Sequence, residues 1–86
     1  MIDEILDEFD FEKVHHAMLA LNWKWHSTDG VPAIADLRRT ARSLLKQVVE
    51  VPNLSRVATG GFVAYMEYGV LGLRFEVSSY EKGIGQ

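Results

Sequence analysis

Hydrophobic residues recur every three or four positions through the first quarter of the chain, the spacing of one face of an α-helix. These positions are Ile2, Ile5, Leu6, Phe9, Phe11, Val14, Met18, Leu21 and Trp25. Asp10 interrupts the series and is a typical N-cap residue, because its carboxylate can accept a hydrogen bond from an amide two or three residues later. We therefore predict a short acidic helix that breaks at Asp10 and a main helix over residues 11–22, with one long helix as the alternative.

A second helical pattern follows a polar loop, residues 26–30, that closes with Asp-Gly. We place Pro32 in its first turn, where the missing N–H of proline has no intrahelical partner. We expect the helix to run to about Val49, because the residue before Pro52 is disfavoured in the helical conformation. The buried stripe of this helix is expected to be Ile34, Leu37, Ala41, Leu44, Leu45 and Val48, opposite a basic face of Arg38, Arg39, Arg42 and Lys46.

The last third of the chain changes from a period of 3.6 to a period of two, which is typical of β-strands. Residues 62–67 and 71–77 form two such runs, and Tyr68-Gly69 between them suits a two-residue hairpin loop. That loop pairs Glu67 with Val70, and it places Met66 opposite Leu71, Ala64 opposite Leu73 and Phe62 opposite Phe75 on one apolar face. On the other face Tyr65 lies opposite Gly72 and can extend across the glycine to Arg74. A shift of one residue would destroy this agreement, so the register is well determined.

These elements predict an α+β fold, with the two amphipathic helices packed on one face of a C-terminal antiparallel β-hairpin. The chain is long enough for one domain, residues 1–86, with a flexible tail over residues 80–86. Residues 52–58 are expected to connect the second helix to the hairpin. A two-stranded sheet is marginal, so a third strand is expected from Leu54–Ala58 or Trp23–His26, unless two copies of the chain join their edges.

The composition narrows the function classes. Hydrophobic residues make up 48% and charged residues 24% of the chain, which is typical of a globular protein. The absence of cysteine excludes disulfides, thiolate metal sites and cysteine nucleophiles. The acidic N-terminal segment does not resemble a secretory signal and no apolar run is long enough to span a membrane, so we expect a soluble cytoplasmic protein.

The sequence contains none of the motifs that would indicate catalysis or phosphate binding by a P-loop, so we predict that the protein is not an enzyme and binds no cofactor. Glu12 has helical spacing to His15 and His16 and could form half of a metal site. No third ligand is evident, and His26 lies beyond the helix. We therefore interpret these histidines as ordinary surface residues and predict no metal site.

The charges are strongly segregated. Residues 1–12 hold six of the twelve acidic side chains and no basic one, whereas residues 36–46 hold four of the nine basic side chains. The basic face could contact a phosphate backbone or an acidic partner. Alternatively, it is a solvated helix face that the acidic N-terminal segment of the same or a neighbouring chain can neutralise. We favour this interpretation because the net charge of the chain is −3.

Two further segments are candidate binding surfaces. Trp23 could be an exposed interface anchor beside the His26 loop, although packing under the hairpin is favoured in so small a domain. Gly60 and Gly61, which follow Thr59, allow positive φ and expose backbone amides that could surround an anion. The same glycines are also typical of a bulge or a tight start to a strand, which we favour. The candidate binding residues are therefore Trp23, His26, Arg38, Arg39, Arg42, Lys46, Thr59, Gly60 and Gly61.

Four segments carry a family resemblance: Asp10–His15, Leu21–Trp25, Val31–Leu37 and Thr59–Phe62. Their pattern, DFEKVH, LNWKW, VPxIxxL and TGGF, resembles a group of small uncharacterised proteins encoded by tailed bacteriophages. The likeness covers residues 9–77. It implies a setting rather than an activity, namely a phage-encoded accessory protein made in the cytoplasm of a bacterial host.

Three hypotheses follow from the sequence. The favoured one is a non-catalytic binding module that acts on a host or defence protein and is able to form a homo-oligomer through a hairpin edge. The second is a nucleic-acid-binding protein that uses the basic face. The third is sequestration of a small anionic ligand, such as a nucleotide, between protomers, with the Gly60 and Gly61 amides and a nearby arginine as donors.

Overall fold

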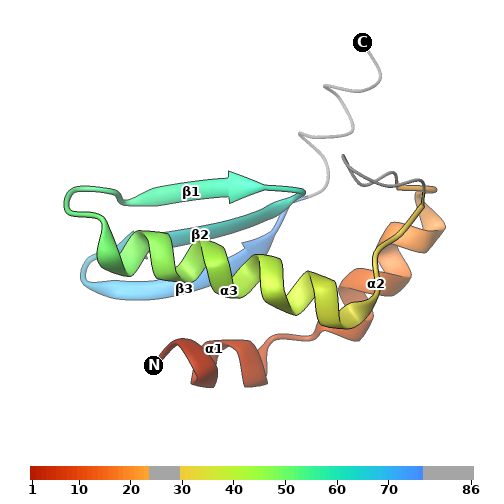
Figure 1. Ribbon diagram of the computed structural model, residues 1–86, viewed down its shortest axis with the longest axis horizontal. Helices are drawn as coiled ribbons and strands as arrows, with labels where there is room; N and C mark the ends of the chain where they lie inside the picture. Colours follow the sequence, from red (N-terminus) through yellow and green to blue (C-terminus); the bar gives the residue numbers. More distant parts are fainter. Residues whose placement is uncertain (24–29, 77–86) are drawn as a thin grey trace, which may run out of the picture.

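The computed structural model describes residues 1–23 and 30–76. The described elements are three helices, α1 (Ile2–Glu8), α2 (Phe11–Ala20) and α3 (Ile34–Glu50), and three strands, β1 (Arg56–Thr59), β2 (Phe62–Glu67) and β3 (Val70–Phe75). The strands form one antiparallel sheet in the order β1-β2-β3. Helix α3 contacts all three strands, and α1 and α2 pack chiefly against α3 (Figure 1). The α+β prediction is confirmed, with α3 rather than both helices making most of the contact with the sheet.

The break between the first two helices lies at the predicted position. Phe9 is extended, with φ −83° and ψ 134°, so α1 cannot continue through it. The Asp10 carboxylate then accepts a hydrogen bond from the Lys13 amide at 3.0 Å and caps α2. The alternative of one long helix is therefore wrong.

Helix α2 ends two residues earlier than expected. Asn22 adopts a left-handed conformation with φ 54°, and the Trp23 amide donates to the Met18 carbonyl at 2.9 Å. This six-to-one hydrogen bond closes a Schellman motif, a common helix C-terminus. The chain therefore reverses at Asn22 and directs Trp23 back toward the core.

Pro32 does not lie in the first turn of α3, contrary to the sequence interpretation. Ala33 is the N-cap and is extended, with φ −66° and ψ 156°, so the helix begins at Ile34. At the other end, Val51 is extended before Pro52, as the steric restriction on residues that precede proline requires.

The predicted register of β2 and β3 is confirmed at every pair, from Glu67–Val70 to Phe62–Phe75. The guanidinium of Arg74 lies 4.8 Å from the centre of the Tyr65 ring. Tyr65 also covers Gly72 so closely that a Cβ there would be 2.3 Å from the ring. The cross-strand arrangement expected for this face is therefore present.

The third strand is β1. Its first three residues lie in the connection predicted over residues 52–58, and its last residue, Thr59, lies one position beyond it. It overlaps the Leu54–Ala58 alternative, and Trp23 is not in a strand. Gly60 and Gly61 form the two-residue turn between β1 and β2, with φ 59° and 91°. Our interpretation of these glycines as a bulge or a tight strand start is therefore corrected to a hairpin turn.

The core lies between α3 and the inner face of the sheet. Its fully buried large side chains come from four elements and are Leu6, Met18, Leu37, Leu45 and Phe62. The rings of Phe9 and Phe11 each lie 6.0 Å from the Phe62 ring, which connects the α1–α2 junction to the sheet. No described helix packs on the outer face of the sheet (Figure 1).

Candidate functional site

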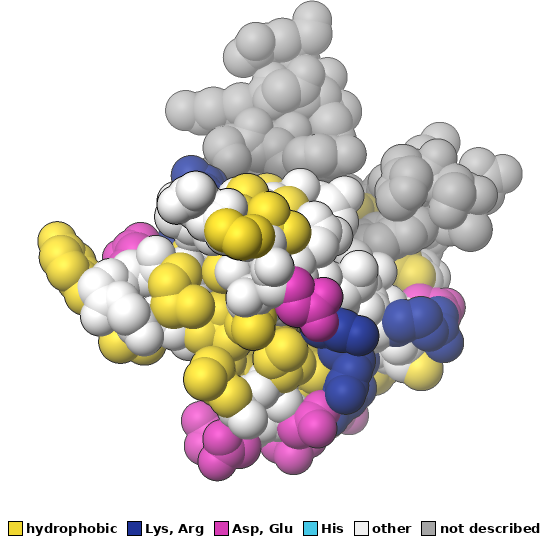
Figure 2. All heavy atoms as spheres, turned by 60° about the vertical axis from the view of Figure 1, so that its left-hand side comes forward, with side chains coloured by type: hydrophobic (Ala, Val, Ile, Leu, Met, Phe, Trp, Pro, Cys, Tyr) yellow, Lys and Arg dark blue, Asp and Glu magenta, His cyan; other side chains and the backbone are white. Residues whose placement is uncertain are grey.

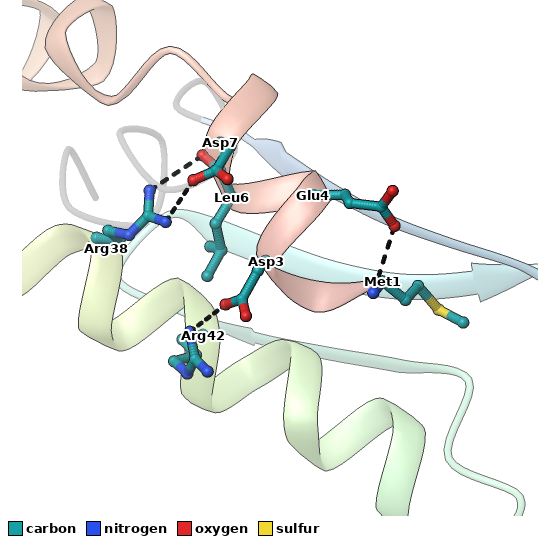
Figure 3. A network of polar contacts seen from close by, with 7 residues as sticks. All are labelled: Met1, Asp3, Glu4, Leu6, Asp7, Arg38 and Arg42. Carbon is teal, nitrogen blue, oxygen red and sulfur yellow. Dashed lines mark hydrogen bonds and ion pairs between the residues drawn. The ribbon is translucent and has the colours of Figure 1, made fainter.

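The basic face of α3 is largely neutralised by α1. Arg38 donates to the Asp7 carboxylate at 2.7 Å and to the Leu6 carbonyl at 3.3 Å, and Arg42 pairs with Asp3 (Figure 3). The close-up shows both arginines pointing toward α1, and their side chains remain 41% and 49% exposed. The acidic segment and the basic face, the two halves of the charge segregation, therefore attach α1 to α3.

The rest of the basic face is formed by Arg39 and Lys46. Arg39 pairs with Asp36 one turn earlier on the same helix, and Lys46 makes no ion pair among the described residues. Arg39, Arg42 and Lys46 border a shallow hollow of about 350 Å³ that Glu50 also lines. This surface has the mixed charge of a solvated helix face, which supports the interpretation favoured from the sequence.

Trp23 is a core residue. Only 6% of its surface is exposed, and its ring lies 5.6 Å from the ring of Phe75. Its role as an exposed interface anchor is therefore excluded, because the Schellman motif turns it inward, and packing against the hairpin is correct. His26 lies outside the described residues.

The Gly60-Gly61 turn contacts core rings on one side and lines a surface hollow on the other. A Cβ on Gly61 would lie 2.6 Å from the Phe75 ring and 3.1 Å from the Trp23 ring, so only glycine allows these rings to approach. The exposed side of the turn lines a hollow of about 210 Å³ together with Thr59, Arg56 and Glu76. The structure thus brings the Thr59–Gly61 segment next to an arginine, as the anionic-ligand hypothesis requires.

The outer face of the sheet carries a charge cluster that the sequence analysis missed. Arg56 on β1 and Arg74 on β3 both contact the Glu76 carboxylate, Arg56 at 3.5 Å and Arg74 more closely. The hydrogen bond from Arg74 lowers the pKa of the Glu76 carboxyl below its usual range and raises the pKa of the Arg74 guanidinium. Three charged residues from two segments, β1 and the end of β3, therefore meet beside the Gly60-Gly61 turn.

A second missed feature is a group of exposed hydrophobic side chains at one end of the molecule. The C-terminal end of α3 and the β2–β3 turn lie at the same end (Figure 1). Their exposed side chains, which we call the apolar end, are Val49, Val51, Tyr68 and Val70. Figure 2, in which this end comes forward, shows hydrophobic side chains gathered there with acidic and basic ones at the margin.

Tyr68 is the most prominent member of the apolar end. Its side chain is completely exposed, and its backbone is left-handed, with φ 52°, followed by Gly69 with φ 79°. Two consecutive positive φ values define the type I′ hairpin turn, whose first position favours asparagine, aspartate or glycine. A bulky aromatic residue is costly there, and its exposure provides no compensating burial.

No group of three potential metal ligands exists among residues 1–23 and 30–76. His15 and His16 are adjacent on α2, with ring centres 6.5 Å apart. No helix in the described part of the chain combines the length and hydrophobicity needed to cross a membrane.

Comparisons with models of protein families, with curated proteins and with solved structures find no match to this chain. The resemblance to bacteriophage proteins therefore stays a prediction. The choice among the three functional hypotheses therefore rests on the geometry of the structure.

Proposed function

We propose that this protein is a non-catalytic protein-binding module and that the apolar end is its contact surface. The observation that carries the proposal is Tyr68, an exposed aromatic side chain held in a left-handed turn position. Strained backbone positions cluster at sites of function. Tyrosine is also enriched among the few interface residues that contribute most of the binding free energy.

The surroundings of Tyr68 favour a protein partner. Val70 is 64% exposed and directly follows the turn, and Val49 and Val51, at the C-terminal end of α3, are 48% and 47% exposed. Exposed aromatic and aliphatic side chains at one end of a molecule are typical of the central part of a protein interface. Burying a side chain of this size releases roughly 1.5–3 kcal/mol.

The nucleic-acid alternative has less support. Arg38 and Arg42 are engaged by α1, and Arg39 is engaged by Asp36. A phosphate backbone would have to compete with these carboxylates for the same guanidinium groups. Binding that depends on few phosphate contacts is weak at physiological salt.

The phage setting implied by the resemblance indicates what kind of protein partner to expect. In the cytoplasm of a bacterial host, a phage accessory protein of this size would bind a host or defence protein, or a second copy of itself. Both outcomes use the same apolar end. They are distinguished by the identity of the protein that is retained.

The proposal is tested by affinity purification from the bacterial host with three forms of the protein. The wild type and Arg39→Gln, an exposed substitution away from the apolar end, are expected to retain the same partner. Tyr68→Asn is expected to lose it, with an affinity at least tenfold lower, about 1.4 kcal/mol. Retention of that partner by all three forms, or no specific retention by the wild type, would contradict the proposal.

A further inference from the structure

The outer face of the sheet carries a second feature, at the opposite end from Tyr68. Strands β1 and β2 are joined by Gly60-Gly61, whereas β2 and β3 are joined by Tyr68-Gly69, and antiparallel strands place these two turns at opposite ends. The hollow of about 210 Å³ lies at the Gly60-Gly61 end. A ligand bound in this hollow would therefore not contact the apolar end.

The hollow is built from an apolar floor and polar walls. Val63 on the central strand is 3% exposed and lies between its cross-strand neighbours Ala58 and Arg74. Thr59 also lines the hollow, and Gly60 and Gly61 bring a turn without side chains. Left-handed turns with bare amides are a common element of anion-binding sites.

Arg56 supplies the charge. Its side chain is 56% exposed, and its only ion pair among the described residues is the 3.5 Å contact with Glu76, at the long limit of a hydrogen bond. A guanidinium has five N–H donors in a planar fork that matches the oxygens of a carboxylate or phosphate. Most of the donor capacity of Arg56 therefore remains available toward the hollow.

Glu76 does not abolish the positive character of the site. Its carboxylate is bonded most closely to Arg74, whose guanidinium also lies over the Tyr65 ring. Arg56 and Arg74 carry two positive charges against the single negative charge of Glu76. The cluster as a whole is positive by one charge. Arg56 and the Glu76 carboxylate line the hollow, whereas Arg74 is not among the lining residues and reaches the cluster through its bond to Glu76.

From this juxtaposition we propose that the hollow bordered by Arg56, Thr59 and Gly60-Gly61 binds a small oxyanion, namely a phosphate or carboxylate group. The guanidinium of Arg56 would hold the anion, and the turn amides would complete its hydrogen bonds. The volume is below the range of pockets for drug-sized ligands. The site thus takes the anionic group of a ligand and leaves any larger remainder in solvent, within one copy of the chain.

The experiment is an NMR titration of the ¹⁵N-labelled protein with inorganic phosphate and, separately, with succinate. The wild type is expected to show saturable shifts of the Gly60 and Gly61 amides with a Kd of about 1 mM or tighter. Saturation by only one of the two anions identifies the oxyanion class, and saturation by both indicates a general site.

Two arginine variants test the assignment, and a third is the control. Arg56→Gln is expected to weaken binding at least tenfold, and Arg56→Lys, which keeps the charge, is expected to bind more tightly than Arg56→Gln. Arg39→Gln on α3 is expected to bind like the wild type. The proposal is overturned if the wild type shows no saturable shifts with either anion, or if Arg56→Gln and Arg56→Lys both bind like the wild type.

Discussion

The turn that carries Tyr68 predicts an unusual result, a stability gain from removing a tyrosine. Tyr68 adopts φ 52°, a conformation that costs a residue with a Cβ about 1–2 kcal/mol. Asparagine tolerates this conformation and makes Asn-Gly, the sequence preferred in type I′ turns. The side chain of Tyr68 is fully exposed, so its replacement removes no buried surface. We expect Tyr68→Asn to stabilise the protein by about 1 kcal/mol.

Urea denaturation and thermal melting measure this gain. For a domain of this size, 1 kcal/mol corresponds to a rise in Tm of about 4–8 °C. With an m-value of about 1–2 kcal/mol/M, the urea midpoint should rise by roughly 0.5–1 M. Tyr68→Ala is the matched control, because it removes the ring but keeps a Cβ at positive φ. Its stability should lie within about 0.5 kcal/mol of the wild type.

The result that refutes this reasoning is equally clear. If Tyr68→Asn has the stability of the wild type or is less stable, the turn is not strained by tyrosine. Tyr68 would then contribute to the fold, and the main support for the apolar end as a binding surface would be removed. A gain with asparagine but not with alanine would instead indicate that Tyr68 serves a purpose other than folding.

Three other changes follow from the packing and the charges. Leu6→Ala should destabilise the protein by about 2–5 kcal/mol, measured by urea denaturation, because the Leu6 side chain on α1 is fully buried. Leu19→Ala should have little effect, because the Leu19 side chain is 55% exposed. Gly61→Ala and Gly69→Ala both place a Cβ at positive φ, but only the Cβ at position 61 would meet two aromatic rings. Thermal melting should therefore show a larger fall in Tm for Gly61→Ala than for Gly69→Ala. Equal falls would refute the close approach of the Trp23 and Phe75 rings to Gly61. The hydrogen bond from Arg74 lowers the pKa of the Glu76 carboxyl, so the stabilisation from this pair is present above the usual carboxyl pKa and is lost as the pH falls through the lowered pKa. Glu76→Gln should therefore flatten this part of the curve of unfolding free energy against pH. An unchanged curve would contradict the pairing.

The hairpin and the helix break could be predicted because each depends on local chemistry. Asp10 caps α2 through an amide three residues away, and the β2–β3 register follows from three apolar pairs around one two-residue turn. Strand β1 was harder to predict, because only Val57 of its side chains faces the core cluster. Gly60-Gly61 was the available signal, since two glycines between strands are typical of a hairpin turn.

The candidate surfaces show the limit of sequence reasoning more clearly. The basic residues of α3 were visible, but the pairing of Arg38 and Arg42 with α1 depends on how the two helices pack. Val51 and Tyr68 are unremarkable in the sequence, and they belong to the same end of the molecule only because α3 ends there and the β2–β3 turn lies there (Figure 1). Likewise, Arg56 reaches Glu76 across a sheet whose first strand was only one of several alternatives.

The most direct test of the central proposal is photocrosslinking from position 68 inside bacterial host cells. A photoreactive phenylalanine replaces Tyr68 in one form and Ser43, on α3 away from the apolar end, in a control form. We predict a discrete covalent adduct with one protein from position 68 and none from position 43, and the mass of the adduct will distinguish a host protein from a second copy of the chain. No adduct from position 68, or the same adduct from both positions, would contradict the apolar end as the contact surface.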